Sequence, residues 1–292
     1  MAESLEERPR DLLIAGHVNV DRFLTVSTFP APDRTVPVSS TRIALGGPAA
    51  NLARIASGYG VRSGIVATIG DGFPEEFLEE LVRAQVDVRS LERVAGRSTP
   101  TCYITVDRRG GQRTLIDQGP MGSSVGGPLD EDILREYSWL HVTTGPPDRH
   151  LRLIRQARAA GLKVAVDPAQ EIHYRWDSRR FATLLDEAEI LFGNRSEIAR
   201  AVRLAGARDP RDLLSRVPTI VRTEGASGAT AFTRDSRLHV RAPRLRAVRS
   251  LVGAGDAFRG GFYSGWFAGQ PLGRCLEAGV RSAGRWVEGT RE

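Results

Sequence analysis

The sequence of 292 residues predicts an α/β fold in which helices cover both faces of a mainly parallel sheet. Short apolar runs, typical of buried strands, alternate along the chain with segments of helical periodicity. Parallel strands need crossover connections, and helices in those crossovers cover the two faces of the sheet. Hydrophobic residues form 41% of the chain, which suits one well-buried domain.

The predicted helices and strands follow one another in regular order. Small and apolar residues at helical spacing predict a first helix over residues 48–59, which ends at Gly60. Acidic residues in the first turn support a second helix over residues 74–84. Further helices are predicted over residues 151–160, 181–188, 196–204, 256–269 and 271–287. Strands are predicted over residues 11–15, 64–69, 140–143, 164–167, 190–193, 219–223 and 230–232.

Two regions with alternating Thr and Val, residues 22–44 and 100–116, interrupt this order and are predicted to be extended. In the second region, Tyr103-Ile104-Thr105-Val106 and Arg113-Thr114-Leu115-Ile116 flank Gly110-Gly111, the pattern of a β-hairpin. The two regions form either an irregular edge of the main sheet or a separate small sheet. Residues 119–128 are predicted to be a loop.

The segment Gly253-Ala254-Gly255-Asp256 near the end of the chain has the composition of an anion-binding turn. Small residues that lead into a helix place free N–H groups and a partial positive charge against an anion. A carboxylate beside that anion can accept a proton from a hydroxyl, so the pair suits phosphoryl transfer to an alcohol. An aspartate at a helix start is also a common N-cap, and this alternative requires no chemistry.

Two further motifs lie near the N-terminus. Gly46-Gly47-Pro48-Ala49-Ala50-Asn51 allows a ligand to approach the backbone, and its asparagine offers both a donor and an acceptor. In Gly16-His17-Val18-Asn19-Val20-Asp21, polar side chains follow the first strand. The alternatives are a tight turn into a helix for the first motif and ordinary turn residues for the second.

These motifs resemble the signatures of the ribokinase-like (PfkB) family of carbohydrate and nucleoside kinases. Gly70-Asp71-Gly72-Phe73 and Thr223-Glu224-Gly225-Ala226-Ser227-Gly228 lie between them in the family's order. The resemblance extends over about residues 11–290. It implies a single ribokinase-like domain whose small β-sheet, formed by about residues 22–44 and 97–118, is a lid over the substrate. It also implies ATP and Mg²⁺ as cofactors.

The resemblance also implies a role for each matching residue. Asp256 is the catalytic base, and the backbone amides of Gly253, Ala254 and Gly255 hold the γ-phosphate. Asn19, Asp21, Gly46, Gly47 and Asn51 bind the acceptor, and Asn194, Thr223, Gly225 and Gly228 bind the nucleotide. Glu197 places Mg²⁺ through water. Asn194 and Glu197 also have the spacing of a helix capping box, so spacing alone leaves that structural alternative open.

The sequence departs from the family pattern at two places. Ser250-Leu251-Val252 stands where the family has Asp-Thr-x before the glycine motif, so we do not expect the monovalent-cation site of that loop. Asp167-Pro168-Ala169-Gln170-Glu171 stands where many sugar-acid and fructose kinases have Asp-x-Asn-x-Arg. The missing Asn and Arg argue against an acceptor that carries a carboxylate.

Composition excludes several other classes of protein. The single lysine, Lys163, opens a predicted strand, so the chain has no Walker-type P-loop. Cys102 and Cys275 lack metal-ligand spacing and are expected to be free thiols. The net charge of +6 comes from scattered arginines, which does not favour nucleic-acid binding. The sequence contains neither an apolar run of membrane-spanning length nor an apolar signal core within residues 1–10, so we expect a cytoplasmic protein.

The sequence therefore favours a kinase that transfers the γ-phosphate of ATP to a sugar or polyol, such as a pentose or hexose. A nucleoside is the second choice of acceptor. A phosphorylated sugar is the third, because Arg97, Arg108, Arg109 and Arg113 could hold its phosphate or could be solvated surface residues. A catalytically weak ligand-binding relative is the alternative from another class. The outer face of the lid suggests a homodimer.

Overall fold

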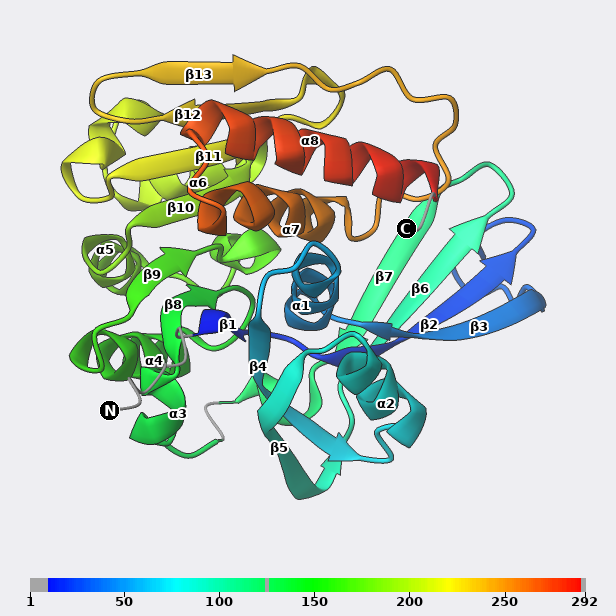
Figure 1. Cartoon of the computed structure of the whole chain (residues 1–292). Coiled ribbons are helices and arrows are strands. Elements are labelled where there is room, and N and C mark those ends of the chain that lie inside the picture. Colours follow the sequence, from blue (N-terminus) through cyan, green and yellow to red (C-terminus); the bar gives the residue numbers. More distant parts are fainter. Residues whose placement is uncertain (1–9, 124–125, 290–292) are drawn as a thin grey trace.

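The computed structural model describes residues 10–123 and 126–289 and contains two sheets (Figure 1). Residues 1–9, in which no signal core was expected, and residues 124–125 of the predicted loop lie outside the described residues.

The main sheet has nine strands in the order β13-β12-β11-β10-β9-β8-β1-β4-β5. Seven neighbouring strands from β5 to β11 are parallel, and β12 and β13 complete the sheet in antiparallel pairing. The strands are β1 (Arg10–Ala15), β4 (Ser63–Asp71), β5 (Asp87–Ser98), β8 (Tyr137–Val142), β9 (Lys163–Val166), β10 (Ile190–Asn194), β11 (Thr219–Thr223), β12 (Ala229–Phe232) and β13 (Arg237–Val240). The predicted parallel sheet is confirmed.

Helices cover both faces of the main sheet (Figure 1). The helices are α1 (Pro48–Gly58), α2 (Glu75–Arg83), α3 (Glu131–Arg135), α4 (Pro147–Ala159), α5 (Ser178–Asp186), α6 (Arg195–Leu204), α7 (Ala254–Phe267) and α8 (Leu272–Glu288). Short 3₁₀ turns are η1 (Gly119–Gly122), η2 (Ala169–His173), η3 (Pro210–Ser215) and η4 (Gly225–Ser227). None of the helices within the described ranges is long and apolar enough to cross a membrane.

The alternation of β1 shows how one strand supports two cores. Leu12 and Ile14 belong to a core with α1, α2, α7 and α8, whereas Leu13 and Ala15 belong to a core with α3, α4, α5 and α6. Successive side chains of a strand point to opposite faces, so a strand buried on both faces must be apolar throughout. This requirement explains the unbroken apolar run that predicted the strand.

A second, four-stranded sheet projects from the main sheet on the right of Figure 1. Its order is β3-β2-β6-β7, with strands β2 (Asn19–Val26), β3 (Val38–Gly46), β6 (Thr101–Asp107) and β7 (Gln112–Asp117). The predicted hairpin is present, because β6 and β7 pair antiparallel with Tyr103 opposite Leu115. The expectation of a separate small sheet is confirmed, and its action as a lid stays a prediction.

Three elements were missing from the sequence prediction: β5, α3 and β13. The strand β5 lies at the edge of the main sheet, and only part of it is buried, so charged residues interrupt its apolar pattern. The predicted loop over residues 119–128 begins with the turn η1.

Burial in the core predicts a large loss of stability on truncation. The side chain of Leu12 is fully buried, whereas that of Val82 on α2 is 57% exposed. Leu12→Ala should lower the free energy of unfolding by about 2–5 kcal/mol, because it removes packed methyl groups and leaves a cavity. Equilibrium unfolding in urea measures the change. Val82→Ala is the matched control, with an expected change within about 0.5 kcal/mol, and equal losses in both variants would contradict the described core.

Candidate active site

The predicted acceptor residues come together where β2 begins and β3 ends. Asn19 and Asp21 lie on β2 with their side chains buried, and the Asn19 amide donates to Asp21 Oδ1 at 2.6 Å. Gly46 is opposite Asn19 in the β2–β3 ladder. A Cβ atom at Gly46 would collide with the Asp21 carboxylate, so a glycine here makes room for that carboxylate. Burial raises the pKa of Asp21 to about 6, against the hydrogen bond from Asn19 and the charge of Arg42.

Helix α1 carries the next predicted residue, Asn51, into the same place. Gly47 is the N-cap of α1, and its carbonyl accepts the backbone N–H of Asn51 at 3.0 Å. The Asn51 side-chain amide donates to Asp256 Oδ2 at 3.1 Å. This hydrogen bond joins the N-terminal motif to the C-terminal one.

Asp256 lies in the first turn of α7 and is 7% exposed. Burial raises the pKa of its carboxyl, whereas the Arg259 guanidinium and the hydrogen bond from Asn51 lower it. The N-cap of α7 is Gly253, in a left-handed conformation (φ 81°) that favours glycine. The structure places Asp256 inside the helix rather than at the N-cap, so the simple capping alternative does not describe it.

The small-residue turn before Asp256 begins α7, with Gly253, Ala254 and Gly255 in consecutive positions. N–H groups in the first turn of a helix have no carbonyl within the helix to bond. The Ala254 amide donates to the Leu251 carbonyl at 3.2 Å, so this amide must change partner to bind an anion.

The predicted nucleotide residues lie at the carboxyl ends of β10 and β11. Asn194 is paired with Thr223 across these two strands. Gly225 begins the turn η4, two residues after Thr223, and Gly228 directly follows this turn. The strands thus bring Asn194, Thr223 and the glycine turn to one edge of the sheet.

Asn194 and Glu197 form the capping box of α6. Asn194 Oδ1 accepts the backbone N–H of Glu197 at 3.0 Å, and Glu197 Oε2 accepts that of Asn194 at 2.6 Å. Burial and the negative charge of Asp167 raise the pKa of Glu197 to about 7. The capping-box alternative is therefore present in the structure. Both residues lie next to the carboxyl end of β10, beside the other predicted nucleotide residues.

The residues present fit a magnesium ion that is held mainly by water and phosphate. Among the residues that the structure describes, no three His, Cys, Asp or Glu side chains gather into a metal site. Glu197 and Asn194 nevertheless offer oxygen ligands, the type that Mg²⁺ prefers while it keeps several waters. Burial, and after it the charge of Asp167, raises the pKa of Glu197, and a bound cation would oppose both effects by favouring the ionised carboxylate.

A cavity of about 710 Å³ begins at Asp21 and Asn51. It extends along α1 to Ile55 and Tyr59 and reaches Trp286 near the end of α8. Its further lining residues include Phe23, Arg42, Leu45, Phe77 and Arg249. The cavity therefore combines apolar walls with positive charge next to the acceptor residues.

The arginines predicted as a phosphate site, Arg97, Arg108, Arg109 and Arg113, are all exposed and do not line this cavity. Arg113 is opposite Thr105, and Thr105 is opposite Leu24 on β2. Side chains alternate along a strand, so Arg113 is on the face of the small sheet that points away from Asp21. The structure favours the alternative, solvated surface, for these four residues.

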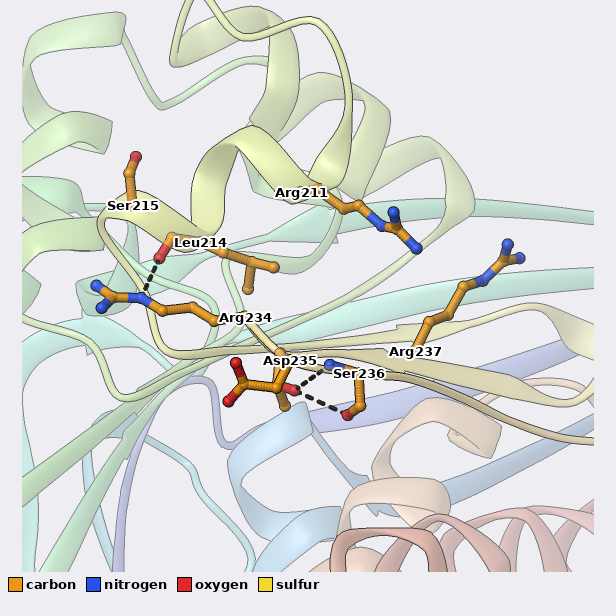
Figure 2. Close-up of a pocket in the computed structure, with 8 residues that line it drawn as sticks. Arg211, Leu214, Ser215, Arg234, Asp235, Ser236 and Arg237 are labelled. Carbon is orange, nitrogen blue, oxygen red and sulfur yellow. Dashed lines mark hydrogen bonds between the residues drawn. The ribbon is translucent and has the colours of Figure 1, made fainter.

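A second pocket has a volume of about 420 Å³, and Figure 2 shows the residues that line it. Arg234, Asp235 and Ser236 of the β12–β13 turn line it. Phe232, next to this turn, is opposite Ile220, whereas Ala229 is opposite Thr223 at the other end of β11. The pocket is therefore at the edge of the main sheet opposite the predicted nucleotide residues.

Sequence reasoning missed Arg259, which is 8% exposed and contacts the predicted base. Its signal was available in the sequence, because Asp256 and Arg259 are three positions apart on a predicted helix. Asp167, which was noted only as a departure from the family pattern, is fully buried and forms an ion pair with Arg259.

Comparisons with known proteins agree with the family and the fold. Residues 9–290 match the family described as pfkB family carbohydrate kinase. The chain is 30% identical over 268 residues to a nucleoside kinase of Methanothermobacter thermautotrophicus, covering 91% of this chain and 85% of that protein. It is 31% identical over 286 residues to an ATP-dependent ribose-1-phosphate kinase of Halopiger xanaduensis, covering 96% and 93%.

A solved structure shows the same architecture. The nucleoside kinase of Methanocaldococcus jannaschii, described as an archaeal member of the ribokinase family, matches with a TM-score of 0.88 at 25% identity. The match covers 96% of this chain and 92% of that chain. The ribokinase-like fold that the sequence predicts is thereby confirmed. The chain belongs to the pfkB family of carbohydrate kinases.

Proposed function

We propose that this protein is an ATP-dependent nucleoside kinase that phosphorylates a hydroxyl group of its acceptor. The observation that carries the proposal is the buried Asp256 carboxylate, held by Asn51 at the start of α7 and beside the cavity that begins at Asp21. The sequence alone favours a sugar or polyol. Relatives named nucleoside kinases at 30% and 25% identity move the preference to a nucleoside.

The cavity supports an acceptor larger than a free sugar. Its volume of about 710 Å³ lies within the range of small-molecule sites. The aromatic and aliphatic side chains of Phe23, Leu45 and Phe77 suit the faces of a planar base. Asp21 and Asn51 offer hydrogen-bond partners for ribose hydroxyls at one end of the cavity.

In the proposed reaction, the Asp256 carboxylate accepts the proton of the acceptor hydroxyl as the oxygen attacks the γ-phosphorus. The bond from the γ-phosphorus to the bridging oxygen breaks, and ADP leaves. The backbone amides of the Gly253–Gly255 turn, with that of Ala254 released from the Leu251 carbonyl, stabilise charge on the transferred phosphoryl group. Asn194, Thr223 and the glycines 225 and 228 hold the nucleotide. Magnesium, placed through water by Glu197, supplies neutralisation of phosphate charge when bound.

A phosphorylated pentose is the second candidate acceptor. A relative named as an ATP-dependent ribose-1-phosphate kinase is 31% identical over 96% of this chain. Arg42 lines the cavity and is close enough to Asp21 to lower the pKa of that carboxyl. A guanidinium near Asp21 suits an acceptor that carries a phosphate, because guanidinium groups form strong hydrogen bonds to phosphate.

An acceptor panel with Mg²⁺ and ATP tests the proposal. We expect kcat/KM for at least one nucleoside to exceed that for free ribose or a polyol by about tenfold or more, because a buried base adds binding energy. ADP release measures the rate. Higher kcat/KM for ribose-1-phosphate would favour the second candidate, and saturable binding of a nucleoside without any turnover would favour the catalytically weak relative.

Asp256→Asn should lower kcat at least about a hundredfold, because it removes the base. Steady-state rates with the best acceptor measure the loss, and acceptor binding by calorimetry should persist. Asp235→Asn, in the remote pocket of Figure 2, is the matched control and should keep the wild-type rate. Equal losses in both variants, or none in Asp256→Asn, would contradict the assigned base.

The loop before α7 predicts that activity is independent of K⁺. Ser250 Oγ accepts the Val252 amide at 3.2 Å, and the Val252 carbonyl accepts the Trp286 indole N–H at 2.6 Å. These oxygens are already bonded, and the loop has no carboxylate between Ser250 and Val252. Replacing K⁺ by tetramethylammonium at constant ionic strength should change kcat by less than a factor of about two. A larger drop, restored by K⁺, would contradict this prediction.

We also propose that the outer face of the small sheet forms a homodimer. Ile43, Arg22, Tyr103 and Leu115 lie in one row across the four strands, on the face opposite to Asp21. The three apolar side chains of this row are 47%, 41% and 75% exposed. Exposed apolar side chains that gather on one face together with an arginine are typical of interaction surfaces.

Analytical ultracentrifugation should therefore give twice the chain mass of 31.8 kDa. Leu115→Arg should shift the protein toward the monomer, because it places a charge in the apolar contact. Val82→Arg is the control, since Val82 is 57% exposed on helix α2 instead of the small sheet. A wild-type monomer at micromolar concentration would refute the dimer.

A further inference from the structure

The guanidinium of Arg259 is buried between two carboxylates. Arg259 Nη2 donates to Asp256 Oδ1 at 2.8 Å, and Nη1 forms an ion pair with Asp167 Oδ2. Arg259 is 8% exposed and Asp167 is fully buried. A charge at such depth is costly unless it is paired and hydrogen-bonded, so the arrangement depends on all three side chains.

Asp167 is itself fixed by the backbone. Its Oδ1 accepts the Ala169 amide at 2.9 Å, and its own amide donates to the Val142 carbonyl at 2.8 Å. The residue directly follows β9, in the middle of the main sheet. The planar guanidinium therefore has one edge held by a rigid part of the fold and another edge on Asp256.

The geometry points to Arg259 as a positioning residue for the Asp256 carboxylate, with Asp167 as the buried anchor that holds Arg259. This inference rests on the proposed function, because it takes Asp256 as the base. Arg259 binds one carboxylate oxygen of Asp256 and Asn51 binds the other. With a donor on each oxygen, the carboxylate cannot rotate freely, and its remaining lone pairs keep fixed directions.

The same arrangement sets the charge around Asp256. The charged groups that act on Asp256 are Asp21 on β2, Asp167 after β9 and Arg259 on α7, whereas Glu197 on α6 acts on Asp167 and Arg259. Arg259 opposes the effect of burial and lowers the pKa of Asp256, whereas Asp167 raises it. Removal of Arg259 and removal of Asp167 should therefore move the titration of the base in opposite directions.

The test is the pH dependence of kcat/KM for the wild type, Arg259→Met and Asp167→Asn, from pH 5 to pH 10 with the best acceptor. A base acts only when deprotonated, so kcat/KM falls as the pH drops below its pKa. Arg259→Met should shift this acidic limb to higher pH by about one unit or more, so its kcat/KM should approach that of the wild type as the pH becomes alkaline. Asp167→Asn should shift the limb to lower pH.

Three further variants separate a positioning role from a merely structural one. Arg259→Lys keeps the positive charge but loses the two-pronged guanidinium. The acidic limb of Arg259→Lys should therefore lie nearer to that of the wild type than the limb of Arg259→Met does. The kcat of Arg259→Lys should be lower than that of the wild type. Glu197→Gln should retain the acidic limb, which excludes Glu197 as its source. If Arg259→Met does not fold, Asp167→Asn/Arg259→Met removes both partners of the ion pair and should still show a raised limb.

Profiles of Arg259→Met, or of the double variant, and of Asp167→Asn that superimpose on the wild type after scaling would overturn the inference. So would shifts of the two single variants in the same direction. Failure of the proposed function is distinguishable, because the wild type itself would then turn over no nucleoside.

Discussion

The burial of the Asp256 carboxylate is the constraint on which the rest of the structure depends. Asp256 lies at the start of α7, the negative groups Asp21 and Asp167 act on it, and Glu197 acts in turn on Asp167. Each added negative charge makes ionisation of the others less favourable. The fold offsets this repulsion with a guanidinium, with the side-chain amides of two asparagines and with the N-terminus of a helix.

The two sheets differ in how completely they are packed. The main sheet is packed on both faces, so the carboxyl ends of β9, β10 and β11 hold Asp167, Asn194 and Thr223 at fixed spacing. The small sheet is packed less completely and carries Asp21 at one end, on the face turned toward α1. Segments with few buried contacts open at low cost in free energy, which suits the part of the molecule that admits the acceptor.

Much of this arrangement could be predicted from the sequence, because strand periodicity and the glycine motifs are local signals. The strand over residues 219–223 and the hairpin from Tyr103 to Ile116 were predicted closely. The edge strand β5 was not, because its exposed side leaves no clear apolar pattern. The meeting of Asn51 with Asp256 was expected only through resemblance. The ion pair of Arg259 with Asp167 was missed, because a partner 92 positions away in sequence leaves no local signal.

The hydrogen bond from Asn51 to Asp256 joins residues 205 positions apart, and this separation has a consequence for synthesis of the protein. Domains acquire their structure as the chain leaves the ribosome from the N-terminus. The β2–β3 hairpin and α1 can therefore form while the partner of Asn51 does not yet exist. Only after α7 and α8 emerge can the last layer close over one face of the main sheet. A chain that stops short of α7 keeps Asn51 but lacks Asp256, so the bond that joins the two motifs can form only when translation has reached the final helices.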